Sequence, residues 1–300
     1  MTYSHETAPT QFIEANGVRY AYRHFGLANG PPIVLLQHFR GGLDNWDPLV
    51  TDGLGRDRAV ILFNNAGVAS SSGEPADTVP AMAKHVTKFL NALGPNQVDL
   101  LGFSLGGFVA QQVAIESPNL IRRLILAGTG PQGGEGMQGF EPKVAAHAAQ
   151  ETPGVENFLY LFFSPSEKSQ AAGRAFWRRR HKRQDQDIPS SKRAMEAQAA
   201  AIANWGVVPK TDRYAYLKKI QQPVLVVNGH RDIMVPTINS FILQQCIPNA
   251  TLVIYPDSGH GAIFQYPELF VSQARLFLSN QPIGAVSRGK IGCHGSQQRR

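Results

Sequence analysis

The 300-residue chain has little cysteine, and this limits how it can be stabilised. Its only two cysteines are Cys246 and Cys293, and Cys293 lies in a polar segment near the end of the chain. Such a composition argues against the disulfide framework that stabilises many small secreted domains. Hydrophobic residues make up 43% of the chain, which is enough for a substantial buried core.

The sequence also lacks segments that direct a chain into or across a membrane. No apolar run approaches the length of a membrane span. The N-terminal MTYSHETAPTQF has no basic stretch followed by an apolar one, as a secretion signal would have. We therefore expect a cytoplasmic protein that has no membrane partner.

Acidic residues are fewer than basic ones, which gives a formal net charge of +7. Much of this charge lies in GRAFWRRRHKRQ, residues 173–184, and in the last residues of the chain. The expected role of the first segment is a solvated helix face, and the alternative is attraction of an acidic substrate toward a nearby site. Because the charge is local, we predict no nucleic-acid partner. Residues 281–300 have hardly any apolar periodicity, so we expect a disordered basic tail there.

Short apolar runs alternate with helical patterns along most of the chain. Continuous apolar runs such as PPIVLLQ at residues 31–37 are typical of fully buried strands. Val79, Met82, Val86 and Leu90 recur at helical spacing between two such runs. A repeated order of strand, helix and strand requires crossover connections, which form parallel sheets. We expect an α/β fold in which helices flank a mostly parallel central sheet.

Residues 131–221 break this alternation because they contain no strand-like run. A connection of this length is too long for a plain loop, so we expect an inserted helical lid. The strand and helix rhythm resumes with QPVLVVNG, so the insertion interrupts one sheet. The predicted organisation is a core in two parts, residues 1–130 and 222–280, with the lid at 131–221 between them.

Ser104 lies between an apolar run and a helical pattern, in LLGFSLGGFVAQQVA. Gly102 and Gly106 flank it at the positions where a sharp strand-to-helix turn needs close approach of the backbone. The same string also occurs in ordinary loops. The strand and helix on either side favour a serine nucleophile over a plain turn.

A serine nucleophile needs a base to take its proton and an acid to orient that base. Asp232 and His260 follow the next two predicted strands, and ligands collect outside the carboxyl ends of parallel strands. The order serine, aspartate, histidine is that of hydrolases with this type of turn. We therefore expect Ser104, Asp232 and His260 to be catalytic.

Other roles for these residues stay open at the level of sequence. Asp232 is also placed to cap a following helix, and a histidine is more often structural than catalytic. Asp257 competes as the acid, but it lies close to His260 in the same loop, where bracing that loop is the expected role. Glu135 is a weaker competitor at the glycine-rich start of the expected lid.

Acyl transfer also requires hydrogen-bond donors for the oxyanion that forms on the attacked carbonyl. The residue after the nucleophile supplies one backbone N–H, which here is Leu105. We expect the second from the loop that follows PPIVLLQ, at the amide of Phe39.

Three segments, GFSLGG, NGHRDIMVP and DSGHGAIFQYPE, resemble the nucleophile, acid and histidine loops of the α/β-hydrolase fold family, in its lidded group of small esterases. The resemblance extends over nearly the whole chain. PPIVLLQHFRGG is similar to the family's oxyanion loop, in which His-Gly-Phe is usual. Gln37 and His38 stand in place of the histidine and glycine, while Phe39 matches.

The resemblance implies a serine hydrolase that cleaves a carboxylic ester or lactone of a small molecule without a metal or organic cofactor. Haloalkane dehalogenases and epoxide hydrolases carry aspartate in place of Ser104, so neither is expected. Carbon–carbon bond hydrolases, thioesterases, cofactor-free haloperoxidase-like enzymes and non-catalytic binding proteins of the same fold remain open. The candidate substrate contacts are His38, Phe162 and Trp177, although packing of the lid onto the core is the alternative role for such aromatic residues.

Overall fold

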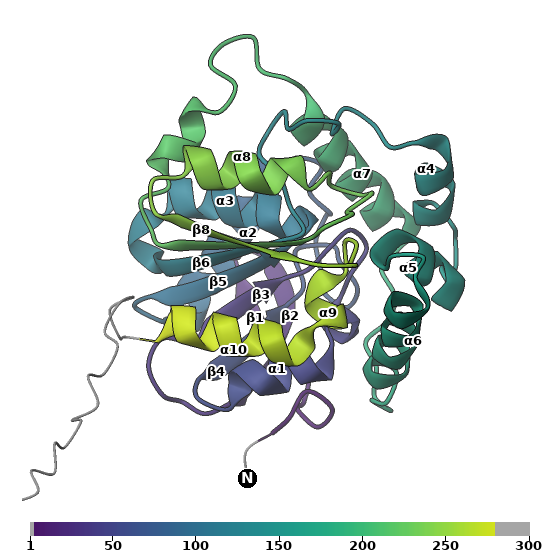
Figure 1. Cartoon of the computed structure of the whole chain (residues 1–300). Helices are drawn as coiled ribbons and strands as arrows, with labels where there is room; N and C mark the ends of the chain where they lie inside the picture. Colours follow the sequence, from purple (N-terminus) through teal and green to yellow (C-terminus); the bar gives the residue numbers. More distant parts are fainter. Residues whose placement is uncertain (1–2, 280–300) are drawn as a thin grey trace, which may run out of the picture.

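A mostly parallel sheet forms the centre of the molecule in a computed structural model that describes residues 3–279 (Figure 1). Its eight strands have the order β1-β2-β4-β3-β5-β6-β7-β8. β2 pairs in antiparallel fashion with β1 and with β4, and every other pairing is parallel. The predicted fold class is therefore confirmed. The strands are β1 (Gln11–Ala15), β2 (Val18–Gly26), β3 (Ile33–Leu36), β4 (Ala59–Phe63), β5 (Val98–Phe103), β6 (Ile121–Ala127), β7 (Val224–Gly229) and β8 (Ala250–Tyr255).

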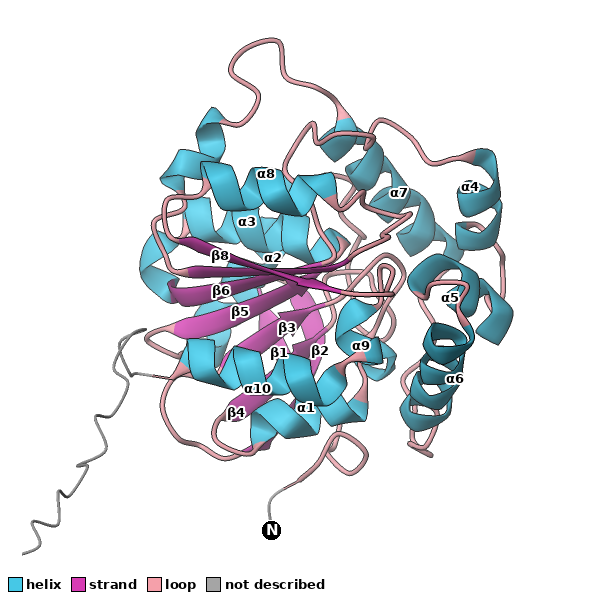
Figure 2. Ribbon diagram, viewed as in Figure 1, coloured by secondary structure: helices cyan, strands magenta, loops and turns pink. Residues whose placement is uncertain are grey.

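Helices cover both faces of this sheet (Figure 2). α1, α9 and α10 pack on one face, and α2, α3 and α8 pack on the other. The central strands β3, β4 and β5 are consequently buried along their whole length, which explains their continuous apolar sequences. The helices of the core are α1 (Pro48–Gly55), α2 (Val79–Leu93), α3 (Leu105–Glu116), α8 (Ile238–Cys246), α9 (Ala262–Gln265) and α10 (Pro267–Leu278), with short 3-10 helices η1 (Leu43–Asn45) and η2 (Pro118–Leu120).

Two details of the core differ from the sequence expectation. The sequence AIFQYPELFVSQARLFL, residues 262–278, predicts one final helix, but the structure splits it into α9 and α10 at Pro267, because proline lacks the N–H that a continuous helix needs. β1 was not predicted, since its residues QFIEA alternate only between half-buried and exposed. It is an edge strand, for which sequence patterns are weak.

Helices without strands fill the chain between β6 and β7 in the described structure. Figure 1 shows α4, α5 and α6 beside the end of the sheet. The helices of this helical insertion are α4 (Pro142–Ala148), α5 (Val155–Phe162), α6 (Glu167–Arg180) and α7 (Lys192–Gly206), followed by the 3-10 helix η3 (Ala215–Lys219).

Only part of the basic segment at the end of α6 is the solvated helix face expected from the sequence. Arg178 is exposed, but Arg179 is half-buried and forms an ion pair with the buried Asp47 of the core. Arg183 is buried, and Arg180 lines a cavity. Packing of α6 against the core, which periodicity alone does not reveal, withdraws these three arginines from solvent.

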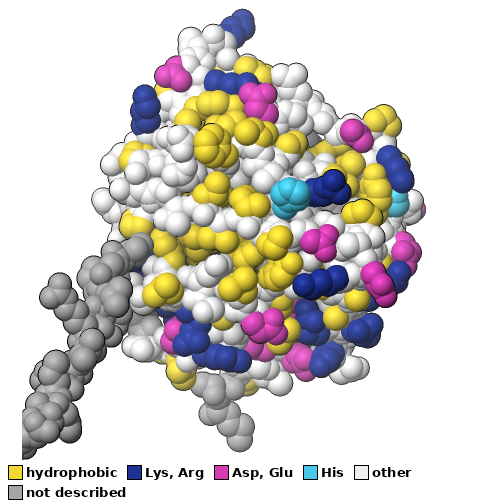
Figure 3. All heavy atoms as spheres, in the orientation of Figure 1, with side chains coloured by type: hydrophobic (Ala, Val, Ile, Leu, Met, Phe, Trp, Pro, Cys, Tyr) yellow, Lys and Arg dark blue, Asp and Glu magenta, His cyan; other side chains and the backbone are white. Residues whose placement is uncertain are grey.

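The surface in Figure 3 carries Lys and Arg interspersed with Asp and Glu. None of the helices within residues 3–279 combines the length and the apolar character required to cross a membrane. The expected basic tail, residues 281–300, lies outside the described residues, as does Cys293.

Candidate active site

Ser104 has an unusual backbone conformation at the turn between β5 and α3. Its φ of 56° and ψ of −120° lie where residues other than glycine are rarely found. A Cβ at Gly106 would lie 2.0 Å from the carbonyl oxygen of Leu36, and one at Gly102 would lie 2.4 Å from the carbonyl oxygen of Gly106. The two glycines therefore allow the turn, the helix and β3 to approach closely, and the turn holds the serine at the end of the strand.

His260 and Asp232 form a buried pair at the ends of β8 and β7. The Nδ1 atom of His260 lies 2.7 Å from Oδ2 of Asp232, and both side chains are almost fully buried. The other carboxylate oxygen, Oδ1, accepts hydrogen bonds from the amides of Met234 at 2.8 Å and Val235 at 2.9 Å. With both oxygens engaged, the carboxylate has a fixed orientation and holds the imidazole in turn.

Backbone contacts hold the loops of Asp232 and His260 together. The amide of Arg231 donates to the carbonyl of Ser258 at 2.9 Å, and a Cβ at Gly229 would lie 2.1 Å from the carbonyl oxygen of Gly259. On the other side, the amide of Gly261 donates to the carbonyl of Phe162 at the end of α5. The glycines around His260 thus serve close packing against α5.

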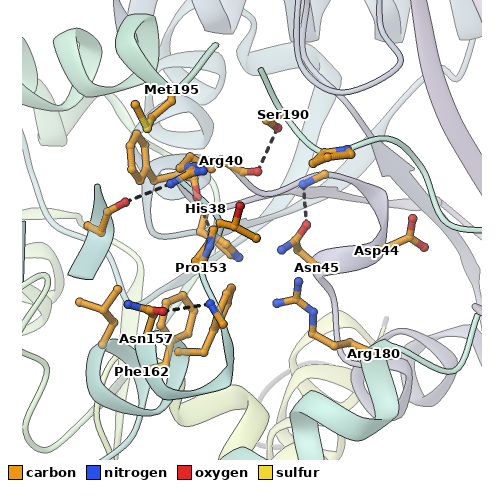
Figure 4. Close-up of a pocket in the computed structure, with 18 of the residues that line it drawn as sticks. His38, Arg40, Asp44, Asn45, Pro153, Asn157, Phe162, Arg180, Ser190 and Met195 are labelled. Carbon is orange, nitrogen blue, oxygen red and sulfur yellow. Dashed lines mark hydrogen bonds between the residues drawn. The ribbon is translucent and has the colours of Figure 1, made fainter. Parts of the chain in front are cut away.

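Ser104 and His260 line the same cavity of about 960 Å³, part of which appears in Figure 4. The ring of Phe103, next to Ser104, lies with its centroid 5.0 Å from that of His260. Within residues 3–279 the Ser104 hydroxyl makes no hydrogen bond. Such bonds often form only when a substrate is present. The arrangement therefore places a hydroxyl and an oriented imidazole on one cavity.

The competing acids lie elsewhere. Asp257 accepts a hydrogen bond from the hydroxyl of Ser166 at 2.6 Å, which connects its loop to α6. Glu135 forms an ion pair with Arg213 at 2.7 Å. Of the aspartates and glutamates between residues 3 and 279, only Asp232 is hydrogen-bonded to His260.

Phe39 and Leu105 lie at neighbouring strand ends. Phe39 follows β3 and lines the cavity, and its amide N–H has no hydrogen-bond partner among the described residues. Leu105 is the first residue of α3, where a backbone N–H has no partner within the helix. Gln198 of α7 holds this loop by accepting a hydrogen bond from the amide of Arg40 at 2.6 Å. Within residues 3–279, both amides are therefore free to donate.

His38 departs from the usual oxyanion loop and is a buried, neutral group. Burial lowers the pKa of His38 to about 3. Its Nδ1 lies 2.7 Å from the carbonyl oxygen of Phe39, and because a carbonyl only accepts, Nδ1 carries the proton. The Nε2 atom is left as a buried acceptor without a partner. The side-chain oxygen of Gln37 accepts from the amide of His38 at 2.8 Å, which fixes the loop.

All three substrate contacts suggested by the sequence, His38, Phe162 and Trp177, line the cavity. Phe162 also packs against the ring of His260, with centroids 5.2 Å apart. Sequence reasoning missed Arg180 and Asn45, which line the same cavity. The run of basic residues was the only signal for Arg180, and nothing in the sequence singled out Asn45.

No group of three or more His, Cys, Asp or Glu side chains within residues 3–279 is placed to hold a metal ion.

Comparison with known proteins identifies the family. The model of the alpha/beta hydrolase fold family matches residues 31–267. The chain is 27% identical to a pimeloyl-[acyl-carrier protein] methyl ester esterase of Nitrosomonas europaea, over 81% of this chain and 94% of that protein. It is 30% identical to a poly(3-hydroxyalkanoate) depolymerase of Ectopseudomonas oleovorans, over 91% of this chain and 93% of that protein.

A solved structure supports the same assignment. An alpha/beta hydrolase fold protein from Chitinophaga pinensis is 46% identical and superimposes with a TM-score of 0.87, covering 93% of this chain and all of that one. With the family match over most of its length and a relative of this similarity, the chain belongs to the α/β-hydrolase fold family.

Proposed function

We propose that this protein is a serine hydrolase that cleaves a carboxylic ester or lactone of a small molecule through an acyl-enzyme intermediate. The observation that carries the proposal is the strained turn at Ser104, which opens on the same cavity as the His260–Asp232 pair. A backbone held in a rarely populated conformation next to an oriented base is typical of a nucleophile.

The proposed reaction uses each of these groups in turn. The Ser104 oxygen attacks the substrate carbonyl while Nε2 of His260 takes its proton, and Asp232 stabilises the imidazolium that forms. The amides of Phe39 and Leu105 donate to the oxyanion. His260 then gives its proton to the departing alcohol, which leaves the acyl group on Ser104. Water, deprotonated by the same histidine, releases the acid and restores the serine.

The relatives favour esters over the alternative substrates. One is named for a methyl ester and the other for a poly(3-hydroxyalkanoate). We infer a small-molecule substrate because the volume of the cavity, about 960 Å³, is in the range of small-ligand sites.

The helical insertion is proposed to act as a lid that selects the substrate. Phe162 from α5 and Trp177 from α6 line the cavity opposite the core, so a substrate bound at Ser104 would contact both helices. His38, which packs edge-on against Phe162 with centroids 5.3 Å apart, completes the proposed substrate contacts.

A panel of p-nitrophenyl esters, lactones and thioesters tests this function. With Ser104→Ala measured in parallel, we expect turnover of esters or lactones by the wild type and a loss of about four to six orders of magnitude in the variant. Thioester turnover alone would favour a thioesterase. A variant that keeps a tenth of the wild-type rate would rule out Ser104 as the nucleophile.

A further inference from the structure

Arg180, the last residue of α6, carries a buried positive charge on the cavity wall. Its guanidinium lies over the rings of Phe158 at 4.5 Å and Trp177 at 4.8 Å. The Nε and Nη1 atoms are buried and have no hydrogen-bond partner. Figure 4 shows the side chain reaching from the helix into the cavity. Aromatic faces stabilise the cation, but they do not satisfy its N–H donors, which lie in the plane of the guanidinium.

Two carboxylates that line the same cavity, Asp44 and Asp187, are already engaged by other partners. Asp44, which also lines the cavity, accepts from Nη2 of Arg23 at 3.1 Å and from the amide of Asp187 at 2.6 Å. The carboxylate of Asp187 accepts from Asn64 at 2.6 Å and from the amide of Ile188 at 2.8 Å. Within residues 3–279, no carboxylate forms an ion pair with Arg180.

The buried guanidinium has no ion pair within residues 3–279, and the attraction of Asp44 offsets only part of the cost of burial, so the site is expected to gain from an anion. Burial lowers the pKa of Arg180 to about 10, which leaves the guanidinium charged at neutral pH. A residue that served only to fill space would be better replaced by an apolar side chain of similar length. The position is thus suited to a ligand that supplies the missing negative charge.

Asn45 offers a second donor on the same cavity. Its side-chain oxygen accepts from the amide of Gly42 at 2.9 Å, which orients the amide group. The Nδ2 atom has no hydrogen-bond partner among the described residues. Figure 4 shows Asn45 and Arg180 on the wall of the cavity. Ser104 lines the same cavity.

We propose that the substrate carries a carboxylate in addition to its scissile ester, and that Arg180, assisted by Asn45, binds that carboxylate. This inference rests on the proposed function of Ser104 and narrows its substrate class to acidic esters. It also assigns the basic end of α6 a direct role in binding, in place of steering from the surface.

Matched pairs of methyl esters test the inference. The monomethyl esters of glutaric, adipic, pimelic and suberic acid are compared with the methyl esters of pentanoic, hexanoic, heptanoic and octanoic acid. Each pair differs only in a terminal carboxylate or methyl group. We expect wild-type kcat/KM to favour the acidic ester, most strongly at the chain length that reaches Arg180. In Arg180→Met, which keeps an apolar stem over the aromatic rings, this preference should fall about 10- to 100-fold.

Two further variants separate binding from structure. Arg178 is an exposed arginine on the same helix. Its replacement in Arg178→Gln should leave the preference and both rates unchanged. Asn45→Asp keeps the acceptor for Gly42 and places a negative charge in the site, so it should lower the preference as well. The inference would be overturned if Arg180→Met and Asn45→Asp lowered kcat/KM equally for the acidic and the neutral ester of each pair. A wild type with no preference at any chain length would overturn it as well.

Binding measurements distinguish this inference from the proposed function. Monomethyl adipate is titrated calorimetrically into Ser104→Ala, with methyl hexanoate as the neutral partner. We expect the acidic ester to bind more tightly, and to lose that advantage in Ser104→Ala/Arg180→Met. If no ester is hydrolysed, the proposed function fails, and the same titration with the wild-type protein still decides whether Arg180 binds a carboxylate.

Discussion

At the scale of single residues, Asp232 and Asp257 differ in what their carboxylates contact. Asp232 holds His260, whereas Asp257 holds the hydroxyl of Ser166. Asp232→Asn should lower kcat/KM about a thousandfold or more, because an amide in that place favours the wrong orientation and tautomer of the imidazole. Asp257→Asn should retain most activity. Steady-state kinetics of the two variants decides between them, and a larger loss in Asp257→Asn would move the acid to the other loop.

His5 is buried and does not line the cavity. It should make the stability of the protein depend on pH. Burial, the largest cause, lowers the pKa of His5 to about 4. In the unfolded chain it takes up a proton near pH 6.5, so the unfolded state binds more protons between these values. The contribution of His5 to the free energy of unfolding should therefore be fully present above pH 6.5. It should fall as the pH drops toward 4, by up to about 3 kcal/mol.

Urea unfolding across this pH range measures the effect. His5→Gln should reduce the slope of stability against pH by about one proton. The matched control is His230→Gln, which replaces an exposed histidine by the same side chain. Equal slopes in the wild type and His5→Gln would show that His5 does not resist protonation in the folded state.

The residues of the candidate site differ in how far sequence could predict them. Ser104, Asp232 and His260 can be singled out because each follows a strand and its local pattern is distinctive. Arg180 cannot, because it is one of several adjacent arginines. Which of them enters the cavity depends on the angle at which α6 packs on the core, and that angle is a tertiary property.

At the scale of elements, the approach of α3 to β3 depends on Gly106. A Cβ there would meet the backbone of Leu36, which cannot rotate away as a side chain can. Gly106→Ala should lower the free energy of unfolding by about 3 kcal/mol. It should also impair catalysis, because Leu36 leads into the loop of Phe39. Gly139→Ala, where a Cβ meets nothing within 4 Å, should change stability by less than about 0.5 kcal/mol. Equal stability in the two variants would contradict this packing.

The attachment of α6 to α1 depends on a partly buried ion pair. Both oxygens of Asp47, the N-cap of α1, accept from Arg179, at 2.9 and 2.6 Å. Arg179→Gln leaves this fully buried carboxylate without its cation, so unfolding in urea should show a loss of about 3 kcal/mol. The control Arg174→Gln breaks an exposed pair with Glu156 and should cost less than about 1 kcal/mol. If Arg179→Gln lowers the free energy of unfolding no more than Arg174→Gln does, Asp47 is stabilised by its other partners.

At the scale of the whole molecule, the parallel part of the sheet was predictable and the antiparallel edge was less so. Strands such as β3 and β5 are buried on both faces, so their sequences are continuous apolar runs that can be recognised. β1 is half-exposed and leaves only a weak alternation. The strand-free length between β6 and β7 predicted a helical insertion, but not how its helices line the cavity, because that depends on contacts between segments distant in sequence.

The central claim is that Ser104 is a nucleophile activated by His260, and covalent labelling tests it most directly. The protein is treated with a fluorophosphonate probe, and the modified residue is located by mass spectrometry of its peptides. We predict one label on the wild type, at Ser104, no label on Ser104→Ala, and much slower labelling of His260→Ala. A wild type that stays unlabelled, or a label on Ser104→Ala equal to that on the wild type, would contradict the account.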